Sequence, residues 1–523
     1  MLIITKNDKI KKQDVLILRS ATMTQILETV DKSRLTVNPL LKNKSELGQF
    51  FTPSSISIFM ASLFSEDKLN NAKVLDAGAG IGSLTSAFLA RLISENIGKA
   101  DLHLLEIDEM LEPYLSETLA LFKDYIEINS QIIIDDFIEW AAYSLLDEES
   151  LLAKDKQRFT HAILNPPYKK IKSNSKHRKL LRKAGIETVN LYSAFVALTV
   201  DLMSDGGEIV FIIPRSFCNG PYFRHFRQHL LNKTSIKHMH LFESRDKAFK
   251  DDEVLQENVI MKLEKGTVQE DVKISISTDD SFSDYKEYRY PFEKIVQPND
   301  IEKFIHINTT NEETLIEKHP NVCYSLEELN IEVSTGPVVD FRVKENLREM
   351  PGEGTVPLFY PNHFVGTSLE YPKMMKKPNA IIRNEKVEKW LYPNGYYVVV
   401  KRFSSKEEKR RIVAGVLTPE SVNDPVVGFE NGLNVLHYNK SGISKEVAYG
   451  LYAYLNSTPV DKYFRIFNGH TQVNATDLRT MKFPSRDILI SLGKWVIENI
   501  ENVGQVEIDS KLEELLLSDQ GNA

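Results

Sequence analysis

The 523-residue sequence has few cysteines and no long apolar run. Cys218 and Cys323 are the only cysteines, which is too few for a disulfide framework and fits a reducing compartment. No stretch has the roughly 20 apolar residues that a membrane-spanning helix needs. The first residues, Met1 to Lys12, lack the apolar core and cleavage site of a signal peptide. We therefore expect a cytoplasmic protein with no membrane partner.

Basic residues are also outnumbered over the whole chain: there are 65 Lys and Arg residues and 73 Asp and Glu residues, so the net charge is −8. This balance excludes general coating of nucleic acid but allows a local basic groove. One such segment is Lys169 to Lys183, which contains no acid. Its basic residues are Lys169, Lys170, Lys172, Lys176, Arg178, Lys179, Arg182 and Lys183. They are either phosphate contacts or an ordinary solvated helix face.

The length exceeds that of one ordinary core, and short apolar runs recur about every thirty residues, each followed by a helical pattern. The predicted strands are Lys73–Leu75, Leu102–Ile107, Gln131–Ile134, His161–Leu164, Glu208–Ile213, Ile236–Phe242 and Val259–Leu263. The segment Glu243 to Asn258 is short for a helical crossover, so the last two strands should be antiparallel. The sequence predicts an α/β fold with a seven-stranded, doubly wound, Rossmann-like sheet of the methyltransferase type.

Four of these strands end in residues suited to ligand binding, and ligands of such sheets lie beyond the carboxyl ends of the strands. The first strand leads into Asp76-Ala-Gly78-Ala-Gly80-Ile-Gly82, where the glycines let the backbone approach a ligand. Glu106 ends the second strand and can accept ribose hydroxyls, while Asp136-Phe137 follows the third. The acid before the first glycine, Asp76, favours S-adenosylmethionine over NAD as the ligand. Each feature alone is equally typical of a structural turn or a helix cap.

The fourth strand ends in Asn165-Pro166-Pro167-Tyr168. The side-chain oxygen of Asn165 and the carbonyl of Pro166 can each accept one N–H of an exocyclic amine, and consecutive prolines hold that backbone rigid. Tyr168 offers a face on which an extruded base can stack. The aromatic ring of Phe249, on the loop before the last strand, can cover the other face of the base or anchor the loop. A purely structural Pro-Pro turn is the alternative for the tetrad.

The order of Gly48-Gln-Phe-Phe-Thr52-Pro53, the glycine turn and Asn165-Pro-Pro-Tyr168 resembles the γ-class DNA N6-adenine methyltransferases of type II restriction-modification systems. The resemblance covers about residues 45 to 265. It implies that Thr52 contacts the donor's carboxylate, Glu106 the ribose and Asp136 the donor adenine, and that Phe249 stacks on the target base. It also implies a bacterial or archaeal cell and a possible cognate restriction endonuclease encoded separately.

The segment Gly469-His470-Thr-Gln472-Val-Asn474 is similar to the PstI/BsuBI-type subgroup, which implies a CTGCAG-like site. It lies in a region with turn-rich short strands, such as Tyr396–Val400 and Gly432–His437. We therefore predict a catalytic domain at 1–310 and a mixed α+β DNA-recognition domain at 311–523. His470, Gln472 and Asn474 are the predicted DNA contacts there, since Gln and Asn can pair with base edges. In the first domain, Lys169, Lys170 and Arg178 are the predicted DNA contacts, through the phosphates. Each is equally compatible with an ordinary surface role.

The sequence thus predicts an S-adenosylmethionine-dependent DNA adenine methyltransferase with Asn165, Pro166 and Tyr168 as its catalytic residues and no metal. It would flip its target adenine out of double-stranded DNA and protect that DNA from a restriction enzyme. Two alternatives are methylation of RNA or of a protein amide, and a catalytically silent DNA-binding subunit. The large C-terminal region argues against the former, and the intact glycine turn and tetrad against the latter.

Overall fold

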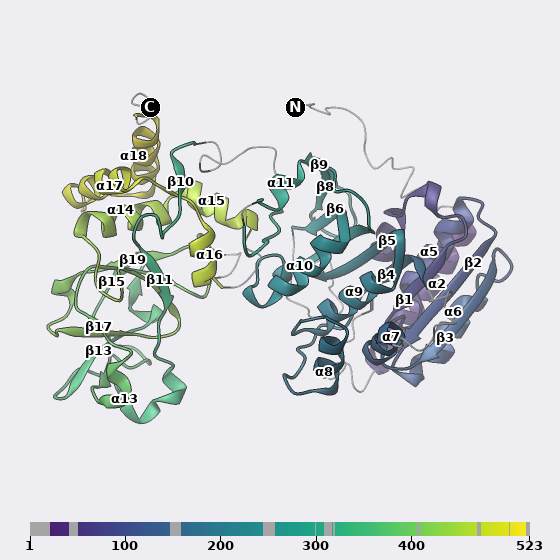
Figure 1. Cartoon of the computed structure of the whole chain (residues 1–523), viewed down its shortest axis with the longest axis horizontal. Coiled ribbons are helices and arrows are strands. Elements are labelled where there is room, and N and C mark those ends of the chain that lie inside the picture. Colours follow the sequence, from purple (N-terminus) through teal and green to yellow (C-terminus); the bar gives the residue numbers. More distant parts are fainter. Residues whose placement is uncertain are drawn as a thin grey trace. The chain divides into compact units, whose positions relative to one another are not determined.

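A computed structural model describes residues 21–40, 51–146, 158–243, 257–298, 300–307, 316, 319–404, 408–467, 472–500 and 503–518. The chain forms two compact units, Met1–Thr309 and Thr310–Ala523 (Figure 1).

Unit 1 is built on one mixed sheet whose strand order is β3-β2-β1-β4-β5-β7-β6-β8-β9. The strands are β1 Lys73–Ala77, β2 Lys99–Glu106, β3 Glu127–Ile134, β4 Phe159–Leu164, β5 Met203–Pro214, β6 Thr234–Phe242, β7 Asn258–Lys265, β8 Val272–Ser277 and β9 Lys286–Tyr290. β1 to β5 are parallel to their neighbours in this order, and β7 is antiparallel to both β5 and β6. All seven predicted strands are present, and the prediction of an antiparallel final pair is confirmed.

The prediction of seven strands is nevertheless wrong for the described sheet, which has nine. β8 pairs with β6 in parallel and β9 pairs with β8 in antiparallel orientation. In β8, Lys273, Ser275 and Ser277 alternate with apolar residues, so the strand does not form the continuous apolar run that marks a fully buried strand. The sheet therefore continues past the edge that the apolar runs alone predicted.

Helices cover both faces of this sheet, and each face has its own apolar core. One core includes side chains from α7 Phe137–Leu146, α8 Lys176–Lys183, α9 Leu191–Leu202 and α10 Arg224–Lys233. The other includes side chains from α2 Ala21–Val37, α4 Ser54–Ser62, α5 Ser83–Ser94 and α6 Glu112–Ala120. Unit 1 also contains α11 Phe292–Ile295 and the 3-10 turns η1 Asn38–Leu40, η2 Glu66–Lys68, η3 Glu109–Leu111, η4 Arg215–Phe217 and η5 Pro221–Phe223. The sheet is thus sandwiched between two helical layers.

The register of the parallel strands brings the ends of β1, β2, β3 and β4 to one edge of the sheet. Ala77 pairs with Leu105, and Glu106 pairs with Ile134. The segments that leave the sheet at this edge are the glycine turn, Glu106 to Asp108, Asp135 to Phe137, and the tetrad. These residues, far apart in sequence, therefore face one common region.

Unit 2 contains smaller sheets and a helical layer. Its strands are β10 Val322–Tyr324, β11 Glu332–Thr335, β12 Leu347–Arg348, β13 Thr355–Phe359, β14 Phe364–Val365, β15 Ser368–Leu369, β16 Ala380–Ile382, β17 Tyr392–Pro393, β18 Tyr397–Lys401, β19 Ala414–Leu417, β20 Val426–Phe429, β21 Leu433–His437 and β22 Phe483–Pro484. Its helices are α13 Glu385–Glu388, α14 Lys445–Asn456, α15 Thr458–Phe467, α16 Ala475–Thr480, α17 Arg486–Glu498 and α18 Gln505–Ser518, with 3-10 turns η6 Asp340–Arg342, η7 Lys344–Asn346, η8 Pro361–His363 and η9 Pro419–Ser421. β18 and β21 match the two strands predicted in this region.

The C-terminal helices pack into the core of unit 2. Leu489 and Leu492 of α17 and Leu512 of α18 are fully buried with residues of α14. Within the part of the chain that the structure describes, no helix is long and apolar enough to cross a membrane.

Candidate active site

A cavity of about 320 Å³ lies at the carboxyl edge of the sheet in unit 1. This volume is at the lower end of the range of small-molecule sites, roughly 300–1,000 Å³. Eight residues predicted for the site line it: Gly78, Gly80, Glu106, Asp136, Phe137, Asn165, Lys169 and Lys170. The structure therefore brings together most of the proposed donor site and one end of the tetrad.

The glycine turn lines this cavity with backbone atoms, because Gly78 and Gly80 have no side chains. Gly80 has a φ of +57°, and a Cβ built on it would lie 2.9 Å from Cε1 of Phe51. The amides of Gly78 and Ala79 both donate to the carbonyl of Leu105 at 2.9 Å, which ties the turn to the end of β2. A side chain at position 80 would thus be strained and would also displace the Phe51 ring.

Glu106 fixes the glycine turn from the neighbouring strand end. One carboxylate oxygen accepts the Gly80 amide at 2.8 Å, and the other accepts the amides of Ile107 and Asp108 at 2.9 Å. Burial raises the pKa of Glu106, and the three amides oppose that rise. A carboxylate oxygen can accept more than one hydrogen bond, so Glu106 can hold the turn and still accept a ligand hydroxyl.

Asp76 lies beneath the turn instead of lining the cavity. Its side chain is fully buried, and one carboxylate oxygen accepts the Thr85 hydroxyl at 2.6 Å. Burial raises the pKa of Asp76 to about 7, and the nearby Glu106 charge adds to the rise. Asp76 is not among the residues that line the cavity, and its role in donor binding stays a prediction.

Asp136 lines the cavity together with His177, a residue that the sequence did not single out. Its Oδ1 accepts the Glu139 amide at 3.1 Å, and its Oδ2 lies 2.9 Å from Nε2 of His177. Burial raises the pKa of Asp136, but the hydrogen bond and charge of His177 outweigh this, and the pKa is lowered overall. Both oxygens of this carboxylate are therefore held in place.

The tetrad is joined to the segment before α4 through its first residue. Nδ2 of Asn165 donates to Oγ1 of the buried Thr52 at 3.0 Å. This bond turns the carboxamide so that its oxygen lies on the opposite side. Thr52 does not line the cavity; instead it orients Asn165.

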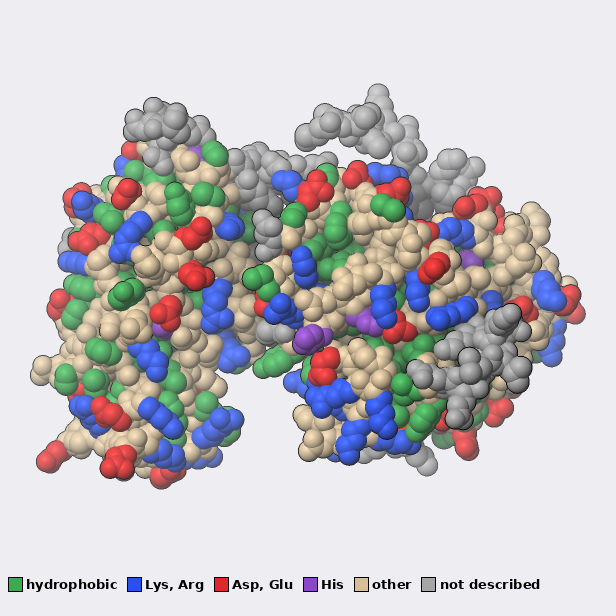
Figure 2. Space-filling model, in the orientation of Figure 1, with side chains coloured by type: hydrophobic (Ala, Val, Ile, Leu, Met, Phe, Trp, Pro, Cys, Tyr) green, Lys and Arg blue, Asp and Glu red, His purple; other side chains and the backbone are tan. Residues whose placement is uncertain are grey.

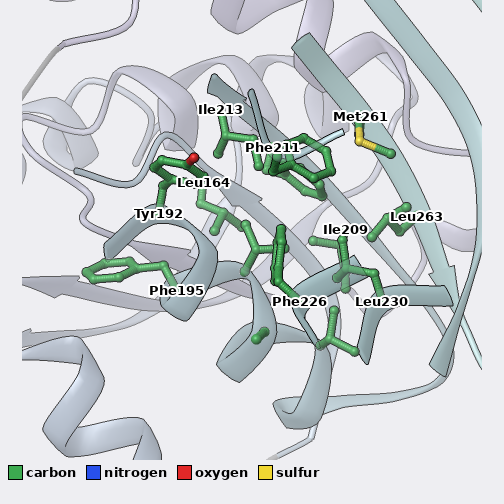
Figure 3. Packing of buried hydrophobic residues seen from close by; sticks show 14 of the residues in the cluster. Leu164, Tyr192, Phe195, Ile209, Phe211, Ile213, Phe226, Leu230, Met261 and Leu263 are labelled. Atoms are coloured by element: carbon green, nitrogen blue, oxygen red, sulfur yellow. The ribbon is translucent and has the colours of Figure 1, made fainter. Parts of the chain in front are cut away.

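Tyr168 ends the tetrad with its ring against the core below α9. Its hydroxyl donates to the Ile212 carbonyl at 3.3 Å, and its ring meets that of Tyr192 edge-on at 6.1 Å. Figure 3 shows Tyr192 and Phe195 of α9 beside Leu164 of β4, within the core that also buries Phe211 of β5. Pro166 is buried. The tetrad is thus anchored at both ends.

The basic segment after the tetrad is largely exposed. Figure 2 shows Lys and Arg side chains gathered over the region where Figure 1 draws α8. The exposed residues are Lys169, Lys170, Lys172, Lys176, Lys179, Arg182 and Lys183. Arg178 is different: it is buried and ion-paired with Glu187. The prediction of Arg178 as a DNA contact is therefore not supported, because its guanidinium packs inside unit 1.

In unit 2, Gln472 and Asn474 adopt different roles. Oε1 of Gln472 accepts from Arg402 at 3.4 Å, and Gln472 forms an isolated bridge with Phe403. Asn474 is the N-cap of α16, and its backbone amide donates to Asp477 at 2.8 Å. Asn474 thus has a structural role that competes with base contact. His470 and Phe249 lie outside the described residues.

Among the residues that line the cavity, Phe195 and His177 were not predicted as site residues, and Phe51 entered the prediction only as part of the motif at residues 48–53. Phe195 belongs to a helix whose apolar pattern indicates only scaffold, and the ring nevertheless faces the glycine turn, 3.8 Å from a Cβ built on Gly78. His177 lies between Lys176 and Arg178 in a run of basic residues, and the sequence pattern does not distinguish it from them. In the described part of the chain, no cluster of His, Cys, Asp and Glu has the arrangement of a metal site.

Unit 1 has the mixed α/β, methyltransferase-like fold, with helices on both faces of a large sheet. A solved structure with a similar fold is that of the type IIL restriction-modification enzyme MmeI in complex with DNA. The TM-score is 0.53 at 10% identity, and the match covers 99% of this chain and 78% of that one. At this identity the likeness supports the fold alone.

Sequence relatives identify the family. A protein-family model described as Eco57I restriction-modification methylase matches residues 56–249 of the sequence. The chain is 98% identical over 501 residues to the type II methyltransferase M.BsuBI of Bacillus subtilis, covering 96% of this chain and 100% of that protein. It is 42% identical over 498 residues to M.PstI of Providencia stuartii, covering 93% and 96%. The chain therefore belongs to the type II methyltransferases of restriction-modification systems, and the predicted PstI/BsuBI-type subgroup is confirmed.

Proposed function

We propose that this protein transfers a methyl group from S-adenosylmethionine to N6 of adenine at a CTGCAG-like site in double-stranded DNA. Unit 1 would be the catalytic domain and unit 2 the recognition domain, in a cytoplasm where a separate restriction enzyme cuts the unmodified site. The observation that carries the proposal is Asn165 at the edge of the cavity, with its amide nitrogen held by Thr52.

The donor fits the cavity by the chemistry of its lining. Glycine backbone, the Glu106 carboxylate and the Asp136 carboxylate follow one another along successive strand ends. An acid suits ribose hydroxyls, and a second acid suits the amine of the donor adenine, with Phe137 as an apolar wall. When bound, the donor supplies an electrophilic methyl group on a sulfonium.

The tetrad aims the adenine amine. Oδ1 of Asn165 and the Pro166 carbonyl would each accept one N–H, which draws the nitrogen toward tetrahedral geometry with its lone pair facing the methyl group. The rigid Pro166-Pro167 backbone fixes these acceptors. The N–C bond forms as the S–C bond breaks, and N6 then releases its extra proton to water. No strong base is needed, which agrees with a site made of amides and carbonyls.

The target base must leave the helix to reach this edge, because the tetrad cannot contact N6 within stacked DNA. Tyr168 would supply one stacking face and Phe249 the other. Lys169, Lys170 and the exposed cations of α8 would contact phosphates, since they extend from the cavity over the surface of unit 1. In unit 2, Gln472 with Arg402 is the described pair best suited to contact base edges, and His470 remains a candidate.

The decisive experiment measures transfer of labelled methyl to unmethylated genomic DNA, followed by mass spectrometry of the base and modification-sensitive sequencing. We expect N6-methyladenine at one motif, with Asn165→Ala inactive and still DNA-bound. CTGCAG would support the full assignment, while another motif would overturn the proposed site. Labelling of RNA or protein instead would overturn the substrate, and no transfer with intact DNA binding would indicate a silent subunit.

A further inference from the structure

We propose that His177 is a positioning residue of the donor site, which orients Asp136 toward the adenine amine of S-adenosylmethionine and specifies adenine over a 6-oxo purine. This inference rests on the proposed function, because it concerns the same cavity. The juxtaposition that carries it is the 2.9 Å contact between His177 Nε2 and Asp136 Oδ2, with both residues in the cavity wall.

Each carboxylate oxygen of Asp136 accepts one hydrogen bond within the protein. Its Oδ1 accepts the Glu139 amide in the first turn of α7. Its Oδ2 accepts from His177, but a carboxylate oxygen has two lone pairs and can accept a second N–H. His177 therefore fixes the direction of the remaining lone pair without using it.

A second contact holds His177 in place. The neighbouring Lys176 pairs with Glu139 of α7 at 2.5 Å, so the first turn of α8 is joined to the first turn of α7 twice. Ser175 caps α8 by accepting the Arg178 amide, which defines where the helix begins. His177 is thus presented to Asp136 by a helix end that is fixed on both sides.

His177 also has the electrostatics of a hydrogen-bond donor to a carboxylate. The hydrogen bond to Asp136 raises the pKa of His177, although partial burial opposes the rise. The other charged groups that face it are Glu139, which favours the imidazolium, and Lys176, which disfavours it. The hydrogen bond favours the charged form of each partner, since it raises the pKa of His177 and lowers that of Asp136, and such charge-assisted bonds are the stronger ones.

The test compares two ligands by calorimetry, S-adenosylhomocysteine and S-inosylhomocysteine; the second has a carbonyl in place of the 6-amino group and a hydrogen on N1. The wild-type protein should prefer the adenine ligand by about tenfold or more, since a site built for an N–H rejects a ligand that lacks it. His177→Ala should weaken the adenine ligand about tenfold and reduce the preference to about threefold or less. His177→Gln should restore most of the preference, because its amide can reach the same oxygen.

The matched control is Asn174→Ala, which changes an exposed residue three positions before His177 that does not line the cavity, and which leaves Asp136 in contact with His177. It should bind both ligands like the wild-type protein. As pH rises from 6 to 9, the wild-type preference should fall as His177 loses its charge, while that of His177→Gln stays constant. This pH comparison uses only the wild-type protein and His177→Gln. It therefore tests the role of His177 even if His177→Ala does not fold.

The outcomes separate two failures. If the wild-type protein binds neither ligand, the proposed donor site fails. If it binds the adenine ligand and His177→Ala keeps the full preference, or merely unfolds at a lower temperature with the preference intact, the role of His177 is overturned and the donor site stands.

Discussion

The amide nitrogen of Asn165 donates to the hydroxyl of Thr52 across 113 residues of sequence, at 3.0 Å. Thr52 is buried just before α4, whereas Asn165 follows β4. A single hydrogen bond thus connects the segment preceding the sheet to the residue proposed to hold the reacting amine. The orientation of a carboxamide is set by its partners, so the hydrogen bond to Thr52 helps to fix the orientation of the Asn165 side chain at the edge of the cavity.

Replacing Thr52 by Val should therefore reduce the rate of methyl transfer without removing any proposed substrate contact. Val keeps the shape but cannot accept the amide N–H, so the carboxamide loses its orientation. We expect kcat to fall about tenfold to a hundredfold, by analogy with other lost orienting partners. Single-turnover kinetics with saturating donor and DNA measure it. Thr52→Ser, which keeps the hydroxyl, is the control and should stay within about threefold of the wild-type rate; an unchanged Val variant would contradict the orienting role.

Replacing Gly80 by Ala should damage the donor site selectively. The new Cβ would lie 2.9 Å from the Phe51 ring, on a residue with a φ of +57°. Positive φ alone costs a non-glycine residue about 1 kcal/mol or more, and the displaced ring narrows the cavity. We expect donor affinity to fall at least about tenfold by calorimetry.

The control for Gly80→Ala is Gly98→Ala, because no atom lies within 4 Å of a Cβ built there. That variant should bind the donor normally. Equal binding by both variants would show that the glycine turn does not approach the donor.

Much of the unit 1 sheet was predictable because buried parallel strands are continuous apolar runs with polar ends. Glu106, Asp136 and Asn165 were found from their position at those ends alone. β8 was missed because Lys and Ser alternate with its apolar residues although most of the strand is buried, and the edge strand β9 was missed because its sequence, KEYRY, is largely polar. This end of the sheet was therefore the part of the unit 1 sheet that was hardest to predict from the sequence.

Side-chain partners were less predictable, because they depend on contacts between distant segments. Arg178 looks like its exposed neighbours in sequence, and only the fold pairs it with Glu187. His177 reaches Asp136 across 41 residues. Asn474 carries a local signal, the acid three residues later at Asp477, and that capping pattern was available in the sequence.

The difference between buried and exposed cations on α8 should be visible in the salt dependence of DNA binding. Lys179 is exposed, so Lys179→Gln should reduce the slope of log affinity against log salt by about one if it contacts a phosphate. Arg178→Gln should leave that slope unchanged and instead lower stability by about 1 kcal/mol, because it breaks the pair with Glu187. Fluorescence anisotropy at several salt concentrations, with a urea titration of each variant, measures both. A reduced slope for Arg178→Gln alone would reverse the assignment.

Asp76 should make the stability of the protein depend on pH between about 4 and 7. Burial raises its pKa from 3.8 to about 7 in the folded protein, while the unfolded chain keeps an ordinary value near 3.9. A raised carboxyl pKa means that the folded state binds the proton more tightly. The stability contributed by this group is therefore fully present below about pH 4 and is lost as pH rises toward 7.

The Asp76→Asn variant lacks this titrating carboxyl, so a comparison with the wild-type protein isolates its contribution to stability. The free energy of unfolding of the wild-type protein, measured relative to that of the variant, should fall by up to about 4 kcal/mol between pH 4 and 8. Urea unfolding at pH 4.5, 5.5, 6.5 and 7.5 gives the curve. Asp284→Asn is the control, because hydrogen bonds from Thr278 lower the pKa of that exposed carboxyl, so its stabilising effect is lost only at lower pH. A flat difference for Asp76→Asn would mean that Asp76 stays ionised in the fold, held by a partner other than Thr85.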